Sequence, residues 1–137
     1  MYAVLDTSVL ISALRSSAGA SHAVLQAIRS KRIKIALSVG LALEYEDVTT
    51  RPGMVPALDA RSVGVVVDVL CALAVHQKVY FTWRPYLVDP GDDMVLELAL
   101  AARTPYIITN NIRHFKGCDS LGIRAITPAE ALTLIRP

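Results

Sequence analysis

Short apolar runs that are typical of β-strands alternate with helical patterns along the whole chain. We expect strands at residues 2–5, 33–37, 105–109 and 123–126. The predicted helices cover residues 7–14, 21–30, 38–48, 57–75, 92–102 and 127–135. Parallel neighbours need a long crossover connection, usually a helix, so this alternation predicts a parallel sheet covered on both faces. The fold class is therefore α/β, a three-layer α/β/α sandwich with a central parallel sheet.

Smaller signals mark the ends of these elements. Ser21 and Ser38 are expected N-caps, and Thr127 begins the last helix with Pro128 at its first position and Glu130 completing a capping box. The run VYFTW (79–83) predicts a further short strand or an extended edge. The breaker RPG (51–53) separates two helices.

Length and composition indicate one domain, 1–137, with a sizeable core. Apolar residues make up 53% of the chain, which favours buried parallel strands or an oligomer interface. No apolar stretch is long enough to cross a bilayer, and no basic segment of a signal peptide is evident, so we expect a cytoplasmic protein without a membrane partner. Cys71 and Cys118 form neither a disulfide framework nor a metal knuckle, which favours a reducing compartment.

The net charge of +2 does not by itself indicate a nucleic-acid-binding protein. A basic cluster, RSKRIK (29–34), is present, and we interpret it as a solvated helix end rather than a phosphate-binding site. The segment FTWRPY (81–86) offers Trp83, Arg84 and Tyr86 either for stacking on RNA bases or for packing on the core, and we favour packing.

Polar side chains follow the first and third expected strands directly. Asp6 ends the run YAVL, and Asn110 and Asn111 follow IIT. Because parallel strands end at the same edge of a sheet, we expect Asp6 and the asparagine pair to converge there. An acid at the end of an apolar run also needs a partner or a metal, since burying an unpaired charge is costly.

Helical spacing selects a second acid, Glu44. Leu41, Tyr45 and Val48 form an inward-facing stripe, and Glu44 borders it, whereas Glu46 points the opposite way. The alternative interpretation is a boundary glutamate whose stem packs while its carboxylate reaches water.

Helical spacing also sorts the acids of the predicted helix 92–102, which starts within DPGDD (89–93). Asp92 leans toward the face formed by Val95 and Ala99, while Asp93 and Glu97 are expected on the opposite face. Acids in a first helical turn also stabilise the helix dipole, by roughly 0.3–1 kcal/mol, which is the simpler interpretation of Asp93.

Asp6, Glu44 and Asp92 are thus expected in or at the rim of one cleft. Three close carboxylates repel one another unless a cation compensates, and none of the three has a lysine or arginine beside it in sequence. A hard divalent cation, Mg²⁺ or Mn²⁺, takes oxygen ligands of this kind. Thr7, Ser8 and Asn111 are neutral neighbours that can orient its water ligands.

Four motifs in order resemble the PIN domain family, above all the PIN-type toxin components of toxin–antitoxin pairs: LDTSVLISAL, LSVGLALEYEDV, DPGDDMVLELALAA and YIITNNIRHF. The resemblance spans residues 2–130. It implies a metal-dependent ribonuclease in which a quartet of acidic or polar residues holds Mg²⁺ or Mn²⁺ and water attacks an RNA phosphodiester. Matched by motif, the quartet is Asp6, Glu44, Asp92 (with Asp93 as a further metal ligand) and Asn111. It further implies an antitoxin partner and a homodimer.

Two positions depart from that family pattern. Asn111 stands where many relatives have an aspartate, and Gly91 stands where another acid is common. Both changes lower the negative charge of the site. They leave open an alternative, a PIN-like domain with weakened or lost catalysis that acts mainly by binding a protein. His114, close to Asn111, is interpreted as a loop histidine bonded to backbone.

Phosphoryl transfer with Asp6 as nucleophile is disfavoured, because the Asp-x-Asp pattern of such enzymes is broken by Ser8.

Overall fold

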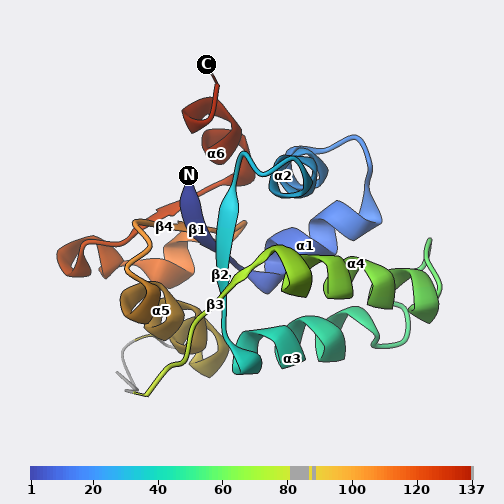
Figure 1. Cartoon of the computed structure of the whole chain (residues 1–137), viewed down its shortest axis with the longest axis horizontal. Helices are drawn as coiled ribbons and strands as arrows, with labels where there is room; N and C mark the ends of the chain where they lie inside the picture. Colours follow the sequence, from blue (N-terminus) through green and yellow to red (C-terminus); the bar gives the residue numbers. More distant parts are fainter. Residues whose placement is uncertain (81–86, 88, 137) are drawn as a thin grey trace.

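The computed structural model describes residues 1–80, 87 and 89–136, and its centre is a parallel sheet. The strands are β1 (Tyr2–Leu5), β2 (Lys34–Leu37), β3 (Val75–His76), β4 (Tyr106–Ile108) and β5 (Arg124–Ile126). They lie in the order β3-β2-β1-β4-β5, and every recorded pair is parallel (Figure 1). The predicted parallel α/β sheet is confirmed.

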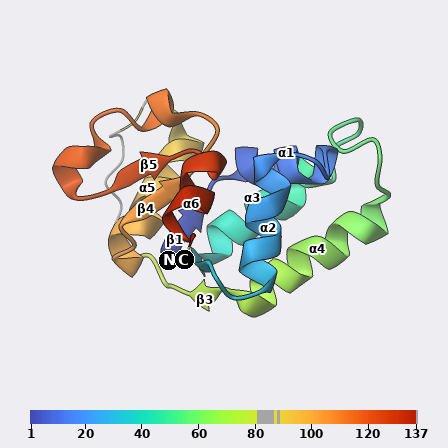
Figure 2. The same ribbon diagram turned by 90° about the horizontal axis from the view of Figure 1, so that it is seen from above.

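Helices cover both faces of this sheet. Their bounds are α1 (Thr7–Arg15), α2 (Ala20–Arg29), α3 (Val39–Thr49), α4 (Ala60–Leu73), α5 (Pro90–Ala102) and α6 (Pro128–Leu134). Helix α5 contacts β1, β2 and β4 on one face, and α1–α4 gather on the other side of the sheet (Figures 1 and 2). Two 3₁₀ turns, η1 (Ile112–Phe115) and η2 (Cys118–Leu121), connect β4 to β5. The three-layer arrangement is therefore also confirmed.

The central strands are apolar throughout because both faces of the sheet are covered. Val4 and Leu5, neighbours that point to opposite faces, are both fully buried, as are Ile107 and Ile108. This explains why the strands appear in the sequence as continuous apolar runs rather than as alternating patterns.

The caps of two helices match the sequence prediction. The Ser38 side chain accepts a hydrogen bond from the Leu41 backbone N–H (3.1 Å), and Thr127 and Glu130 form the reciprocal capping box of α6. The third expected cap is wrong: the N-cap of α2 is Gly19, two residues before Ser21, and Ser21 is buried inside the first turn.

The segment around β3 differs from the prediction. Val75 was expected to end a helix that begins at residue 57, but α4 runs from Ala60 to Leu73, and its Asp59 cap accepts from the Ser62 backbone N–H (2.7 Å). The next strand was expected at 79–83. Residues 79 and 80 have no regular structure, and residues 81–83 lie outside the described part of the chain. A two-residue edge strand with both side chains exposed carries no periodic signal, so β3 could not be recognised.

In the described part of the chain, no helix has the length and apolar character needed to cross a membrane.

Candidate active site

Asp6 lies at the carboxyl end of β1, beside the position where the strand order reverses between β1 and β4. This switch point is where open parallel sheets bind ligands. The Asp6 backbone N–H donates to the Ile108 carbonyl (2.9 Å), and its side chain is 6% exposed. Its Oδ2 accepts hydrogen bonds from the Thr109 hydroxyl (2.7 Å) and the Ser8 hydroxyl (2.8 Å). The strand ends therefore hold the Asp6 carboxylate in one orientation.

The exits of β1 and β4 converge, as predicted. The Asn110 side chain donates to the Ser8 carbonyl (3.2 Å) and the Ser12 hydroxyl (2.9 Å). The Asn111 backbone N–H donates to Thr109 Oγ1 (2.9 Å), which in turn donates to Asp6. Asn111 is half-buried and is the N-cap of η1. The Thr109 side chain thus links it to Asp6.

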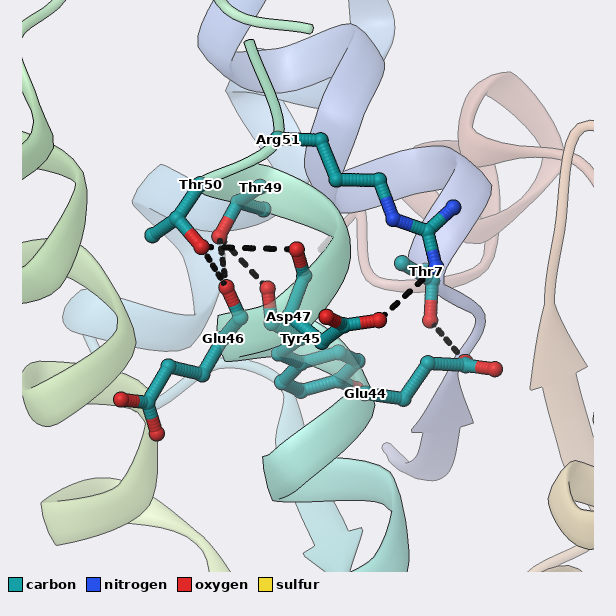
Figure 3. A network of polar contacts seen from close by, with 8 residues as sticks. All are labelled: Thr7, Glu44, Tyr45, Glu46, Asp47, Thr49, Thr50 and Arg51. Carbon is teal, nitrogen blue, oxygen red and sulfur yellow. Dashed lines mark hydrogen bonds and ion pairs between the residues drawn. The ribbon is translucent and has the colours of Figure 1, made fainter.

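Glu44 reaches the same site from α3. Its half-buried carboxylate accepts a hydrogen bond at Oε2 from the hydroxyl of Thr7, the first residue of α1 (2.5 Å, Figure 3). Glu44 Oε1 would lie 3.2 Å from a Cβ added at Gly91, so the carboxylate also reaches the start of α5. Two members of the predicted inward stripe, Leu41 and Tyr45, are fully buried, and the third, Val48, is half-buried.

The first turn of α5 brings in Asp92, whose side chain is 14% exposed. The pKa of Asp92 is raised from 3.8 to about 6: burial is the largest cause, the negative charges of Asp6, Asp89 and Glu44 contribute in the same direction, and His114 acts in the opposite direction. Asp6, Glu44 and Asp92 are therefore close enough to interact electrostatically, as the helical spacing predicted.

Asp93 and Glu97 were expected on the face opposite the core face of Val95 and Ala99, and the structure buries that face as well. They are 3% and 4% exposed. Asp93 accepts a hydrogen bond from the Leu87 backbone N–H (2.7 Å), and its charge helps to raise the pKa of Cys118, a residue of η2. Helix α5 lies between the sheet and the β4–β5 connection, so it has no fully exposed face. The contacts of Asp93 thus differ from those of Asp92, and its role as a metal ligand stays a prediction.

The sequence argument missed three residues of the site. Asp89 caps α5 and adds to the negative charge felt by Asp92. Thr109 is fully buried and joins Asp6 to Asn111. His114 was interpreted as bonded to backbone, yet its ring Nδ1 lies 3.4 Å from Asp92 Oδ2. Asp89, Thr109 and His114 lie within DPGDD, IIT and NIRHF, respectively. These segments adjoin predicted site residues, and this was the signal in the sequence that could have found them.

The basic cluster noted in the sequence does not join the site. The basic cluster 29–34 follows α2 and enters β2, so it lies at the amino edge of the sheet, opposite the carboxylates. Trp83, Arg84 and Tyr86 lie outside the described residues.

A family model described as the PIN domain matches residues 2–113, a segment that contains all five predicted site residues. The chain belongs to the PIN domain family. Members of this family are generally nucleases. No curated protein matches the chain.

The fold of this PIN domain is also found among solved structures. A chain in the crystal structure of VapBC2 from Rickettsia felis bound to a DNA fragment from their promoter superposes with a TM-score of 0.64. The match covers 93% of this chain and 98% of that chain, at 16% sequence identity. The likeness at this identity concerns the fold, and it agrees with the parallel sheet described above.

PIN domains generally use divalent metal ions. Within residues 1–80, 87 and 89–136, no three His, Cys, Asp or Glu side chains stand together in an arrangement that could hold a metal ion. Glu44 and Asp92 are instead turned toward Thr7 and His114. The chemistry of the donors nevertheless fits a hard cation, because all are carboxylate oxygens and their mutual repulsion contributes to the raised pKa of Asp92.

Tyr45 lies beneath this group of acids. It is fully buried, and its hydroxyl donates to the carbonyl of Leu5, the residue before Asp6. Burial raises the pKa of Tyr45 well above its usual value, and the charges of Asp6 and Glu44 add to the effect. The phenol thus lies close to two of the three carboxylates.

Proposed function

We propose that this PIN domain is a divalent-metal-dependent ribonuclease that hydrolyses RNA phosphodiesters and serves as the toxin of a toxin–antitoxin pair. The observation that carries the proposal is the gathering of Asp6, Glu44 and Asp92 at the switch point of the sheet, where Glu44 accepts from Thr7, the neighbour of Asp6, and where the charges of Asp6 and Glu44 add to the effect of burial in raising the pKa of Asp92. Carboxylates that repel one another in a partly buried site are a typical binding site for a cation.

Asp6, Glu44 and Asp92 would hold one Mg²⁺ or Mn²⁺ ion, with Asp93 as a further ligand. Asp6 is already fixed by Ser8 and Thr109, whereas Glu44 and Asp92 would turn away from Thr7 and His114 to bind. When bound, the ion neutralises negative charge on the phosphate and makes a water molecule more acidic.

The protein groups then supply the rest of the chemistry. Asp92 or Glu44 accepts the proton of the attacking water, since a carboxylate in this position can act as a general base. The new bond joins the water oxygen to phosphorus, and the bond to the leaving ribose oxygen breaks as that oxygen takes up a proton. The Asn111 amide can donate to a phosphate oxygen. Arg113 and Lys116 follow Asn111, are exposed, and offer positive charge to the RNA backbone.

A cleavage assay on mixed RNAs with Mg²⁺, Mn²⁺ or EDTA tests this function. Asp6→Asn keeps an oxygen that can accept from Ser8 and Thr109 but removes the charge, so it should preserve the fold and abolish cleavage. Asp47→Asn is the matched control, because Asp47 is an exposed acid on α3 that pairs with Arg51 (2.8 Å, Figure 3). Full activity of Asp6→Asn, or equal cleavage in EDTA, would contradict the proposal.

A second candidate is a PIN domain that no longer cleaves RNA and mainly binds a protein partner. Asn111 favours it, because an amide adds no negative charge to the site. Titration with Mn²⁺ separates the two candidates, since a site that binds the ion raises the melting temperature and a lost site does not.

We further propose a cognate antitoxin as partner, a homodimeric state and a cytoplasmic location. The fold likeness to a chain of the VapBC2 structure supports the antitoxin partner, together with the resemblance of the four motifs to PIN-type toxins. Induced expression should arrest bacterial growth, and co-expression of the antitoxin should relieve the arrest. Growth that continues during expression of the folded protein would contradict the toxin role. Sedimentation of the purified chain tests the dimer.

A further inference from the structure

Two side-chain hydrogen bonds fasten the middle of α3 to the junction between β1 and α1. The Tyr45 hydroxyl donates to the Leu5 carbonyl, and the Thr7 hydroxyl donates to Glu44 Oε2 (2.5 Å, Figure 3). Tyr45 and Leu5 are both fully buried. These contacts connect residues 37 and 40 positions apart in the chain, so they are tertiary contacts and not part of a helix.

The Leu5 carbonyl needs this donor because the neighbouring strand ends. The register between β1 and β2 pairs Tyr2 with Lys34 and Ala3 with Ile35. Strand β2 ends at Leu37, and the chain then turns into α3. A buried carbonyl without a partner is costly, and the Tyr45 hydroxyl satisfies it where the strand ladder stops.

This hydrogen bond joins the neighbours of two site carboxylates, since Leu5 precedes Asp6 and Tyr45 follows Glu44. We propose that Tyr45 is a positioning residue whose hydroxyl fixes α3 against the end of β1 and thereby sets the separation of the Glu44 and Asp6 carboxylates. The inference rests on the proposed function, because these carboxylates are the proposed metal ligands.

The variant Tyr45→Phe isolates the hydroxyl, since it keeps the ring that fills the core. Loss of the bond frees α3 to shift relative to β1, which misplaces Glu44 against Asp6. Contacts that orient metal ligands typically contribute about 10- to 100-fold to metal affinity or activity. We therefore expect Mn²⁺ to bind at least ~10-fold more weakly, with a similar fall in kcat. The KM for RNA should change little, because Tyr45 is buried and does not face the substrate.

Thr49→Val is the matched control. Thr49 is on the same helix, is 2% exposed, and donates its hydroxyl to the Tyr45 carbonyl (2.5 Å, Figure 3). Both variants remove one buried hydroxyl from α3, so both should lower the melting temperature. The Thr49 hydrogen bond joins two residues of α3, whereas the Tyr45 hydrogen bond joins α3 to β1. Only Tyr45→Phe should therefore change metal binding and kcat.

Calorimetric titration of Mn²⁺ into the wild type and both variants tests the proposal, at a temperature where circular dichroism shows all three folded. Weaker binding by Tyr45→Phe alone supports it, and equal affinity in all three proteins overturns it. If the wild type binds no Mn²⁺, the proposed function fails and a second readout decides the positioning role. In that case the ¹³C resonances of the Asp6 and Glu44 carboxyls should both shift in Tyr45→Phe, and neither should shift in Thr49→Val. Unchanged resonances in Tyr45→Phe overturn the inference.

Discussion

Replacing Asp92 with asparagine should stabilise the metal-free protein at neutral pH. Folding raises the pKa of Asp92 from 3.8 to about 6, through burial and the charges of Asp6, Asp89 and Glu44. A pKa raised by folding means that the folded state binds the proton more tightly than the unfolded state. The ionised Asp92 carboxylate therefore destabilises the fold, and this effect grows as the pH rises from about 4 to 6.

The size of the effect follows from the shift. One pKa unit corresponds to about 1.4 kcal/mol, so the shift sets an upper limit of about 3 kcal/mol on the free energy by which ionised Asp92 destabilises the fold. Solvent screening at the rim of the site reduces this to about 1–2 kcal/mol. For a domain of this size, that range corresponds to a rise in melting temperature of roughly 3–8 °C. The Asp92→Asn variant also loses the contact with His114 (3.4 Å), which is partly exposed and contributes little.

Thermal unfolding in EDTA at pH 7.5 and pH 4 measures this effect. Asp92→Asn should melt above the wild type at pH 7.5, and the difference should shrink at pH 4, where the wild-type carboxyl is protonated in the folded state. Asp47→Asn, an exposed acid on α3, should show no such pH-dependent gain. Addition of Mn²⁺ at pH 7.5 should stabilise the wild type more than Asp92→Asn. The reasoning would be refuted if Asp92→Asn melted below the wild type at pH 7.5. It would also be refuted if the difference in melting temperature between the two proteins were the same at both pH values.

Two other side chains give simpler predictions. Thr109→Val removes the hydroxyl that donates to Asp6 and accepts from Asn111, so Mn²⁺ affinity measured by calorimetry should fall by ~10-fold or more; an unchanged affinity would contradict this. Thr104 carries a buried hydroxyl with no hydrogen-bond partner among the described residues. Thr104→Val should therefore leave the free energy of unfolding, measured in urea, unchanged or raise it by about 1–3 kcal/mol. A clear loss of stability would show that this hydroxyl is hydrogen-bonded.

The parallel sheet and part of the site followed from simple rules. Short apolar runs separated by helices predict parallel strands, and parallel strands end at one edge, which brought Asp6 to Asn110 and Asn111. Glu44 followed from its position beside the Leu41 and Tyr45 stripe, because α3 packs one face on the core.

Other features depend on what the rest of the chain covers. Helical spacing assigns α5 a single buried face, which placed Asp93 and Glu97 on the side away from the core. Helix α5 is buried on several sides, so both residues are buried. Strand β3 has two exposed residues and no pattern to read. The Tyr45 bond to Leu5 joins positions 40 residues apart, and only the folded chain shows that a strand ladder stops there.

The most direct test of the account is calorimetric titration of Mn²⁺ into the wild type, Asp6→Asn, Glu44→Gln, Asp92→Asn and the control Asp47→Asn. The wild type and Asp47→Asn should bind Mn²⁺ alike. Each of the other three variants should lose at least ~10-fold in affinity, because each removes one carboxylate from the same ion. A wild type that binds no Mn²⁺, or binding of equal strength in all five proteins, would contradict the claim that Asp6, Glu44 and Asp92 form one metal-dependent site.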